Sequence, residues 1–118
     1  MKPTEEYPEA IFKMFIGGKW VASSDKKTQS VYTPIDGTEI AKVQKATVKD
    51  AEKAINSAYK NKDKIADMPA VERAALLEEI GELIYDYFDE LVELIILDAG
   101  KPRSVAEGEV KATAERFK

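Results

Sequence analysis

The residues best suited to chemistry surround a sharp corner in the chain, over residues 93–110. Asp98 stands between an apolar run and Gly100, so its carboxylate could coordinate a cation or form a cap or an ion pair. Lys101 lies between this glycine and a proline, and its ammonium group could hold a phosphate or complement a helix end. For both Asp98 and Lys101, the alternative is a purely structural role at the end of a helix.

Other catalytic designs find less support in these residues. Glu107, Glu109 and Glu115 could serve as paired acids, but no apolar surroundings are evident that would raise a pKa, and a solvated helix face is the better interpretation. The chain contains no Cys and no His. It therefore lacks a thiol nucleophile, an imidazole base, a thiolate zinc site and any disulfide. The residues alone indicate a mixed α and β unit without a visible active site.

The composition limits the classes of protein to which this chain can belong. The chain has 118 residues, 44% of them hydrophobic and 34% charged, which is typical of one globular domain or a piece of one. Its formal net charge of -4 argues against a nucleic-acid surface. The N-terminus lacks the pattern of a signal peptide and no apolar run is long enough to span a membrane, so we expect a cytoplasmic protein. The balance of Lys, Glu and Ile without Cys suits a thermophile.

We expect an α+β fold in one partial domain, with residues 1–13 as a leader, residues 14–46 as a β-ribbon and residues 47–118 as a helical part. Gly17-Gly18 predicts a tight hairpin turn, with Trp20 as an anchor. Alternating residues predict strands over 28–33 and 39–46, joined by a turn at Asp36-Gly37.

About four helices follow the ribbon. Thr47 and Asp50 form a near capping box for the first helix, which we expect to fade in the charged stretch 60–64. Its apolar face holds Val48, Ala51, Ala54, Ile55 and Ala58. Asp67 is the expected cap of the second helix, with Pro69 in its first turn. The second helix turns six apolar residues inward: Val71, Leu76, Leu77, Ile80, Leu83 and Ile84.

The third and fourth helices meet at the corner. The third begins at Asp86 or Asp89 and is apolar around most of its circumference, which predicts that further protein covers it. Gly100 should end it with a positive φ angle. The last helix begins at about Pro102 or Ser104 and has four residues directed inward: Ala106, Val110, Thr113 and Phe117. It stops without a cap, which suggests a chain cut within a helix.

The order of these signals closely resembles the N-terminal part of NAD(P)-dependent aldehyde dehydrogenases, from about Phe15 to Lys118. The resemblance rests on five ordered segments: residues 15–21, Thr33-Pro34 with Gly37 and Val43, the capped helix 47–58, residues 72–77, and residues 98–102 with Glu109-Val110. Residues 67–73 and 99–111 look most like the archaeal branch of non-phosphorylating glyceraldehyde-3-phosphate dehydrogenases. The chain departs from the family at Thr33, where Asn is common.

The resemblance implies an activity for the full-length enzyme of which this chain would be a part, called the parent enzyme below. Such an enzyme oxidises an aldehyde, here with glyceraldehyde-3-phosphate as one candidate, through a cysteine thiohemiacetal, and it passes hydride to NAD or NADP. The family's catalytic and dinucleotide-binding residues all lie downstream of Lys118, so we expect none here and an inactive chain. Some members hold a monovalent cation near the positions of Asp98, Val31 and Tyr32. The implied partners are the rest of the chain, a small aldehyde substrate and further copies in a homo-oligomer, with no nucleic acid or membrane.

A second interpretation, from a different class, stays open at this stage. The chain could be a free-standing helical interaction module that binds a partner through the crowded apolar face of the third helix.

Overall fold

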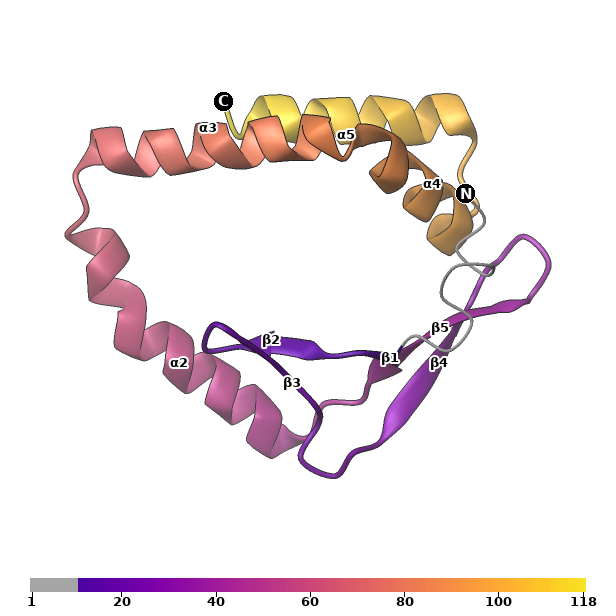
Figure 1. Cartoon of the computed structure of the whole chain (residues 1–118), viewed down its shortest axis with the longest axis horizontal. Helices are drawn as coiled ribbons and strands as arrows, with labels where there is room; N and C mark the ends of the chain where they lie inside the picture. The colour runs from indigo at the N-terminus through magenta and orange to yellow at the C-terminus, as the bar shows by residue number, and fades with distance from the viewer. Residues whose placement is uncertain (1–10) are drawn as a thin grey trace.

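The computed structural model describes residues 11–118, which are arranged as an open, flat ring of 48 × 38 × 19 Å (Figure 1). Five strands and helix α2 (Val48–Ala66) form one side of the ring. Helices α3 (Ala70–Asp86), α4 (Phe88–Ala99) and α5 (Arg103–Arg116) form the other side. The α+β class, with strands followed by four helices in the described part, is confirmed.

The strands make two separate small sheets. In the first, β5 (Glu39–Gln44) lies between β1 (Ile11–Phe12), which is parallel to it, and β4 (Thr28–Tyr32), which is antiparallel. The second is the hairpin of β2 (Met14–Ile16) and β3 (Lys19–Val21). Gly37 has a φ angle of 78° in the turn before β5. The two strands predicted after the hairpin, and the turn between them, are confirmed.

The hairpin has the predicted turn. Gly17 and Gly18 have φ angles of 61° and 77°, a combination that glycine adopts without steric strain. Phe15 and Trp20 face each other across the strands with ring centroids 5.0 Å apart, so Trp20 anchors the hairpin as expected. Trp20 nevertheless remains 68% exposed.

The expected leader over residues 1–13 is shorter in the structure. Ile11 and Phe12 belong to β1, because their backbone groups pair with residues 42 and 43 of β5. Two residues carry too little periodicity to reveal a strand, and its partner lies 31 positions away. Residues 1–10 lie outside the described part, and the leader remains a prediction there.

Helix α2 begins as predicted but ends later. Thr47 accepts a hydrogen bond from the backbone of Asp50, whose side chain accepts one from the backbone of Thr47, which makes a complete capping box. The helix continues through the charged stretch 60–64 to Ala66, because lysine is a good helix former and no breaker occurs before Pro69. The expected inward face of this helix is wrong, because its five residues are all exposed, Ile55 to 68%, although the hairpin turn approaches α2 at Ser57.

The corner between α2 and α3 differs from the prediction. Asp67 is the C-terminal cap of α2, and Pro69 occupies the N-cap position of α3. The guanidinium group of Arg73 donates hydrogen bonds to the carbonyls of Ile65, Ala66 and Met68. Arg73 therefore links the first turn of α3 to carbonyl groups at and just after the end of α2.

The core lies where α4 and α5 cross. Val92, Ala106 and Val110 are buried, and five partly buried residues pack on them: Ile84, Phe88, Leu91, Ile95 and Ile96. Ala106 and Val110 confirm the inward face of α5, whereas Thr113 is exposed and the adjacent Ala114 is buried in its place. Ala114 is buried instead of Thr113 because α3 crosses α5 at this point, where Ala114 lies against Gly81.

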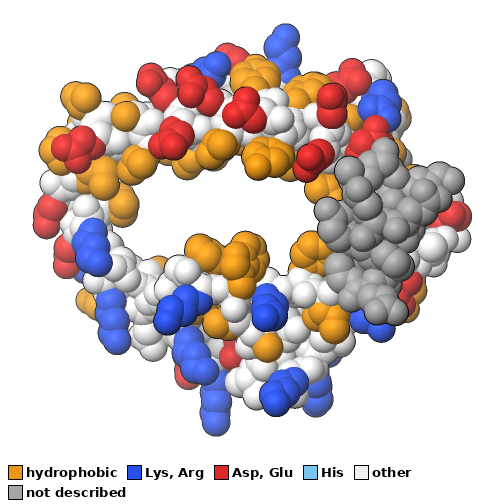
Figure 2. Space-filling model, in the orientation of Figure 1, with side chains coloured by type: hydrophobic (Ala, Val, Ile, Leu, Met, Phe, Trp, Pro, Cys, Tyr) orange, Lys and Arg blue, Asp and Glu red, His pale blue; other side chains and the backbone are white. Residues whose placement is uncertain are grey.

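Much of the apolar surface is left uncovered. The exposed apolar set comprises Phe15, Trp20, Leu76, Leu77, Ile80 and Leu83, each 41–68% exposed. Val71, expected inside α3, is 81% exposed. Figure 2 shows hydrophobic side chains along both sides of the opening of the ring. No helix among residues 11–118 has both the length and the apolar character needed to cross a bilayer.

Candidate functional site

The corner at Gly100 is built as the sequence predicts. Gly100 caps α4 in the left-handed conformation, with a φ angle of 65°, and its N–H donates to the carbonyl of Ile96. Lys101 pairs with Glu109 at 2.5 Å, and Arg103 pairs with Glu93. The Arg103 guanidinium lowers the pKa of Glu93. Both cations are therefore engaged in ion pairs across the corner, which is the structural alternative for Lys101.

A groove between the first sheet and α4 brings two of the three predicted cation-binding residues together. Val31 and Asp98 both line this groove, which has a volume of about 350 Å³. The other lining residues are apolar: Ile40, Ala41, Val43, Leu91, Leu94, Ile95 and Leu97. Tyr32 follows Val31 at the end of β4, where it is exposed and is not part of the lining.

Asp98 is the one acidic residue in the lining of this groove. Among residues 11–118, no three His, Cys, Asp or Glu side chains gather as a metal site would require. Asp98 supplies a single carboxylate, and its pairing with Lys101 or Arg103 does not occur in the described ion pairs. The register of β4 and β5 shifts between Val31 and Tyr32, so the ladder is irregular beside the groove. Hard cations bind oxygen atoms, among them those of carboxylates and backbone carbonyls.

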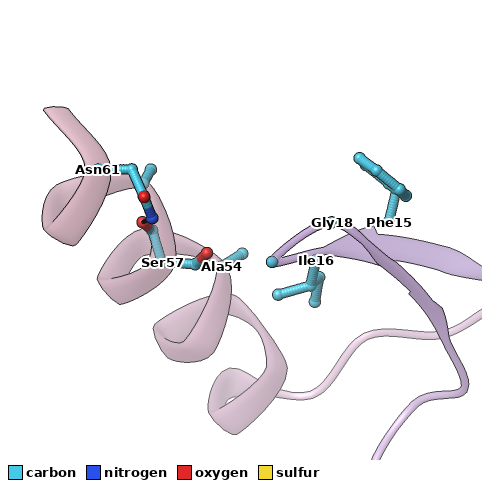
Figure 3. A pocket seen from close by; sticks show the side chains of 8 residues that line it. Phe15, Ile16, Gly18, Ala54, Ser57 and Asn61 are labelled. Carbon is cyan, nitrogen blue, oxygen red and sulfur yellow. Dashed lines mark hydrogen bonds between the residues drawn. The ribbon is translucent and has the colours of Figure 1, made fainter. Parts of the chain in front are cut away.

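A second concavity lies between the hairpin turn and α2 (Figure 3). Its volume is about 510 Å³, and its lining includes Ile16, Gly18, Ser57 and Asn61. The amide group of Asn61 donates to the carbonyl of Ser57 at 2.8 Å, within the same helix. No acid, base or nucleophile with an activating partner faces this space among its lining residues. The residues that line this concavity therefore give no indication of a catalytic function.

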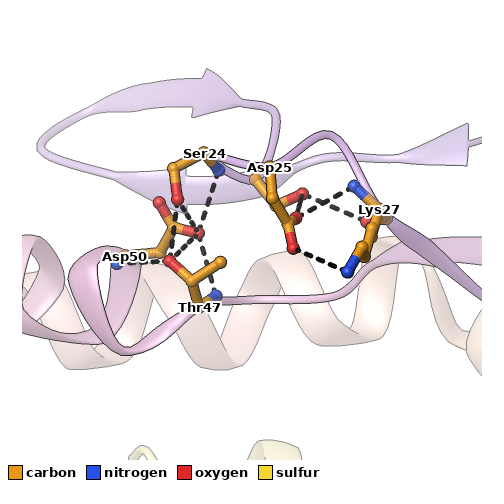
Figure 4. Close-up of polar contacts among 6 residues, drawn as sticks. Ser24, Asp25, Lys27, Thr47 and Asp50 are labelled. Carbon is orange, nitrogen blue, oxygen red and sulfur yellow. Dashed lines mark hydrogen bonds and ion pairs between the residues drawn. The ribbon is translucent and has the colours of Figure 1, made fainter.

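A polar cluster joins the loop before β4 to the start of α2 (Figure 4). One oxygen of Asp50, Oδ2, accepts hydrogen bonds from the backbone N–H of Thr47 at 2.9 Å and of Ser24 at 3.0 Å, and from both hydroxyl groups. These bonds, the one from Thr47 first, lower the pKa of Asp50 to about 2. Asp50 is buried, and its Oδ2 oxygen accepts all four of these bonds. Its role is to hold the ribbon on α2.

Two further interactions have no signal in the sequence. The hydroxyl of Tyr85 donates to Glu115 at 2.5 Å, which raises the pKa of Tyr85 and links α3 to α5. Ser24 joins the capping box of α2 from 23 residues upstream of Thr47. Sequence reasoning misses both pairs, because the partners meet only through the packing of distant elements. Both pairs are structural.

The sequence matches the profile of the family described as "Aldehyde dehydrogenase family" over residues 20–118. The malonate-semialdehyde dehydrogenase of Bacillus pumilus (strain SAFR-032) is 35% identical over 105 residues, which are 89% of this chain and 22% of that protein. The succinate-semialdehyde dehydrogenase [NADP(+)] 2 of Schizosaccharomyces pombe (strain 972 / ATCC 24843) is 40% identical over 96 residues, 81% of this chain and 20% of that protein.

The fold also matches solved structures of aldehyde dehydrogenases over most of this chain. The crystal structure of an NAD-dependent aldehyde dehydrogenase from Sinorhizobium meliloti superposes with a TM-score of 0.85 at 27% identity. The match covers 92% of this chain and 22% of that one. The chain therefore spans about a fifth of the length of the curated relatives that it matches.

Proposed function

The chain belongs to the aldehyde dehydrogenase family, and we propose that it forms the N-terminal part of the cofactor-binding domain of an NAD(P)-dependent aldehyde dehydrogenase. The observation that carries this proposal is the match to the family over residues 20–118, in one ordered stretch. The chain has no Cys to form a thiohemiacetal with an aldehyde. The chemistry therefore belongs to the rest of the parent enzyme, and this chain contributes structure to it.

The rest of the parent chain is the natural cover for the exposed apolar set. Surfaces of this kind cost free energy in water, and the relatives carry about four fifths of their length beyond the matched part. A free-standing interaction module is less favoured, because the family match spans both the strands and the helices. By likeness to the family we also propose a homo-oligomer, and from the sequence pattern and composition a cytoplasmic protein of a thermophile.

The names of the two sequence relatives point to one class of aldehyde, whereas similar solved structures are named for 3,6-anhydro-L-galactose, benzaldehyde and betaine aldehyde. Malonate and succinate semialdehydes are short aldehydes that carry an anionic group. Glyceraldehyde-3-phosphate, which the sequence resemblance suggests, belongs to the same chemical class. We propose that the parent accepts short anionic aldehydes, with NAD or NADP as the oxidant. One relative is named for NADP and one solved structure for NAD.

The proposal is tested by following the absorbance of reduced nicotinamide with these three aldehydes and both cofactors. The parent enzyme should turn over, and the 118-residue chain should stay at the level of a buffer blank, because it lacks the nucleophile. Turnover that copurifies with the 118-residue chain would contradict the proposal. A parent enzyme inactive with every aldehyde would contradict it as well.

We also propose that Asp98 holds a monovalent cation together with backbone carbonyls at Val31 and Tyr32. The groove that contains Val31 and Asp98 supports this, together with the irregular ladder beside it. The melting temperature should be higher in sodium or potassium chloride than in choline chloride at equal ionic strength. Asp98→Asn should remove this difference, while Asp89→Asn, at the other end of α4, should keep it. A difference that survives Asp98→Asn would exclude the site.

A further inference from the structure

The loop between β4 and β5 contains the one Asp-Gly sequence of this chain, Asp36-Gly37. Both residues are exposed. Glycine has no Cβ atom, so its backbone nitrogen is the least obstructed of any residue when it approaches the carboxyl group of the residue before it. The pair is therefore a candidate for a spontaneous chemical change of the backbone.

This change proceeds through a cyclic imide. The backbone nitrogen of Gly37 forms a bond to Cγ of the protonated Asp36 carboxyl group, and the hydroxyl of that group leaves with the proton of the nitrogen as water. Water then opens the ring. Opening at Cγ restores aspartate, whereas opening at the main-chain carbonyl carbon leaves isoaspartate, in which the backbone runs through the side chain. Each water that leaves is regained, and no oxidant or reductant takes part.

The folded loop engages both reacting groups. The nitrogen of Gly37 donates its hydrogen to the carbonyl oxygen of Thr33 at 3.0 Å. Oδ1 of Asp36 accepts a hydrogen bond from the backbone N–H of Thr38 at 2.9 Å. Hydrogen bonds from the side chain and the backbone of Thr38 lower the pKa of Asp36, so the protonated form that can lose water is scarce. The attacking nitrogen and the carboxyl group are both held in unreactive states.

Two further hydrogen bonds close the loop around this pair. The N–H of Thr33 donates to the carbonyl oxygen of Thr38 at 2.9 Å, and the N–H of Ile35 donates to Oγ1 of Thr33 at 3.3 Å. Thr33 is buried, so its position is fixed by its surroundings. The loop must therefore open locally, with loss of these bonds, before the nitrogen of Gly37 is free to attack.

We propose that Asp36-Gly37 is a site of spontaneous aspartate isomerisation, and that the bonded loop of residues 33–38 slows this reaction in the folded chain. An isoaspartate here would lengthen the main chain within a closed loop. Pro34 of the same loop lies beside the end of α4, since a Cβ built on Gly100 would lie 3.0 Å from its Cγ. The reaction would therefore disturb the corner at Gly100. The proposal stands independently of the enzymatic proposal.

Peptide mapping after a long incubation tests this proposal. Trypsin releases residues 28–42, in which Asp36 is the one Asp and no Asn occurs. The isoaspartate form of this peptide has the same mass, separates by chromatography and resists cleavage by endoproteinase Asp-N. In guanidinium chloride, which opens the loop, isoaspartate should accumulate at least about tenfold faster than in the folded chain at the same pH and temperature.

Either of two results in this comparison would overturn the proposal. Equal rates in the folded and the denatured chain would show that the loop gives no protection. A denatured chain that forms no isoaspartate at Asp36 would show that this is no site. Gly37→Ala is the chemical control and is compared in guanidinium chloride, where its backbone is unstrained. It should react more slowly than the original chain, because its Cβ obstructs the attack, and an equal rate would contradict attack by this nitrogen.

Two threonine variants test the loop in the folded chain. Thr33→Val removes the oxygen that accepts from Ile35 but keeps the backbone carbonyl and a side chain of similar size, so isoaspartate should form severalfold faster. Thr28→Val, at the exposed start of β4, is the matched control and should react at the original rate. Circular dichroism checks that both variants are folded. Equal rates in the two folded variants would contradict control of the reaction by the loop.

Discussion

Gly100 meets two constraints at once, one from its backbone and one from its surroundings. Its φ angle of 65° lies in the left-handed region, where a Cβ atom crowds the following carbonyl. A Cβ built on it would also lie 3.0 Å from Cγ of Pro34, in the loop between β4 and β5. The same glycine therefore ends α4 and allows the helix end to approach the first sheet.

Replacing Gly100 should destabilise the chain. We expect Gly100→Ala to lower the free energy of unfolding by about 1–2 kcal/mol through backbone strain. Gly108→Ala is the control, because no atom outside its own helix lies within 4 Å of the added Cβ. It should raise the free energy of unfolding by about 0.5–1 kcal/mol. Urea unfolding measures both, and a neutral Gly100→Ala would show that the corner imposes no strain.

Asp50 should make stability depend on acid pH. Its pKa is about 2 in the folded chain and 3.8 ordinarily, so the unfolded chain binds more protons between these values. The stabilising contribution is therefore complete above pH 3.8 and is lost as the pH falls through 2. Asp50→Asn removes the titrating group while it keeps an oxygen that can accept hydrogen bonds.

The measurement compares thermal unfolding of the two chains from about pH 5 to about pH 2. The original chain should lose stability more steeply than Asp50→Asn over this range. Other carboxylates with lowered pKa values, such as Asp25 and Glu93, titrate in both chains and cancel in the comparison. If the stability of the two chains fell equally with pH, the bonds from Thr47 and Ser24 would not favour the carboxylate form of Asp50.

At the scale of the elements, Gly81 sets the distance between α3 and α5. A Cβ at this position would lie 2.9 Å from the carbonyl oxygen of Ala114, closer than real Cβ contacts allow. The neighbouring Tyr85 also reaches across to Glu115. Small residues at 81 and 114 therefore let two helices approach closely enough for this bond.

Gly81→Ala should push the two helices apart. A backbone carbonyl cannot move without shifting α5, so overpacking should cost about 1–3 kcal/mol, more than the gain of about 0.5–1 kcal/mol from helix propensity. Urea unfolding should show a less stable chain, opposite in sign to Gly108→Ala. The absorbance titration of Tyr85 should shift toward that of a free tyrosine as its bond to Glu115 is lost. A stabilised Gly81→Ala variant would contradict the close crossing.

At the scale of the whole molecule, the open ring leaves the exposed apolar set in water. We expect the chain to bind a neutral solvatochromic dye strongly, because apolar side chains line both sides of the opening. Ile80→Gln with Leu83→Gln should reduce the dye emission without loss of helix by circular dichroism. In the parent enzyme the emission should be weak, since the remaining chain covers this surface. Strong emission from the intact parent would contradict that cover.

Local patterns were enough to predict most elements of this chain. Gly17-Gly18, the box of Thr47 and Asp50, and Gly100 before Pro102 specify turns and caps through backbone conformations that few other residues adopt. The ordered set of such signals also indicated the family. The predicted end of α2 was wrong, because its lysine-rich stretch remains helical. The predicted N-cap of α3 was also wrong, and Arg73 supports this corner through bonds to residues before α3.

Burial was decided by the tertiary structure. Helical periodicity identifies an apolar face, but it does not say whether another element covers that face. Val92 and Val110 are buried because α4 crosses α5, while Ile55 and Ile80 have equally good patterns and remain 68% and 41% exposed. The meeting of Val31 with Asp98, 67 positions apart in the sequence, likewise depends on how α4 packs against the first sheet. Such long-range contacts have no local signal, since they follow from the packing of whole elements.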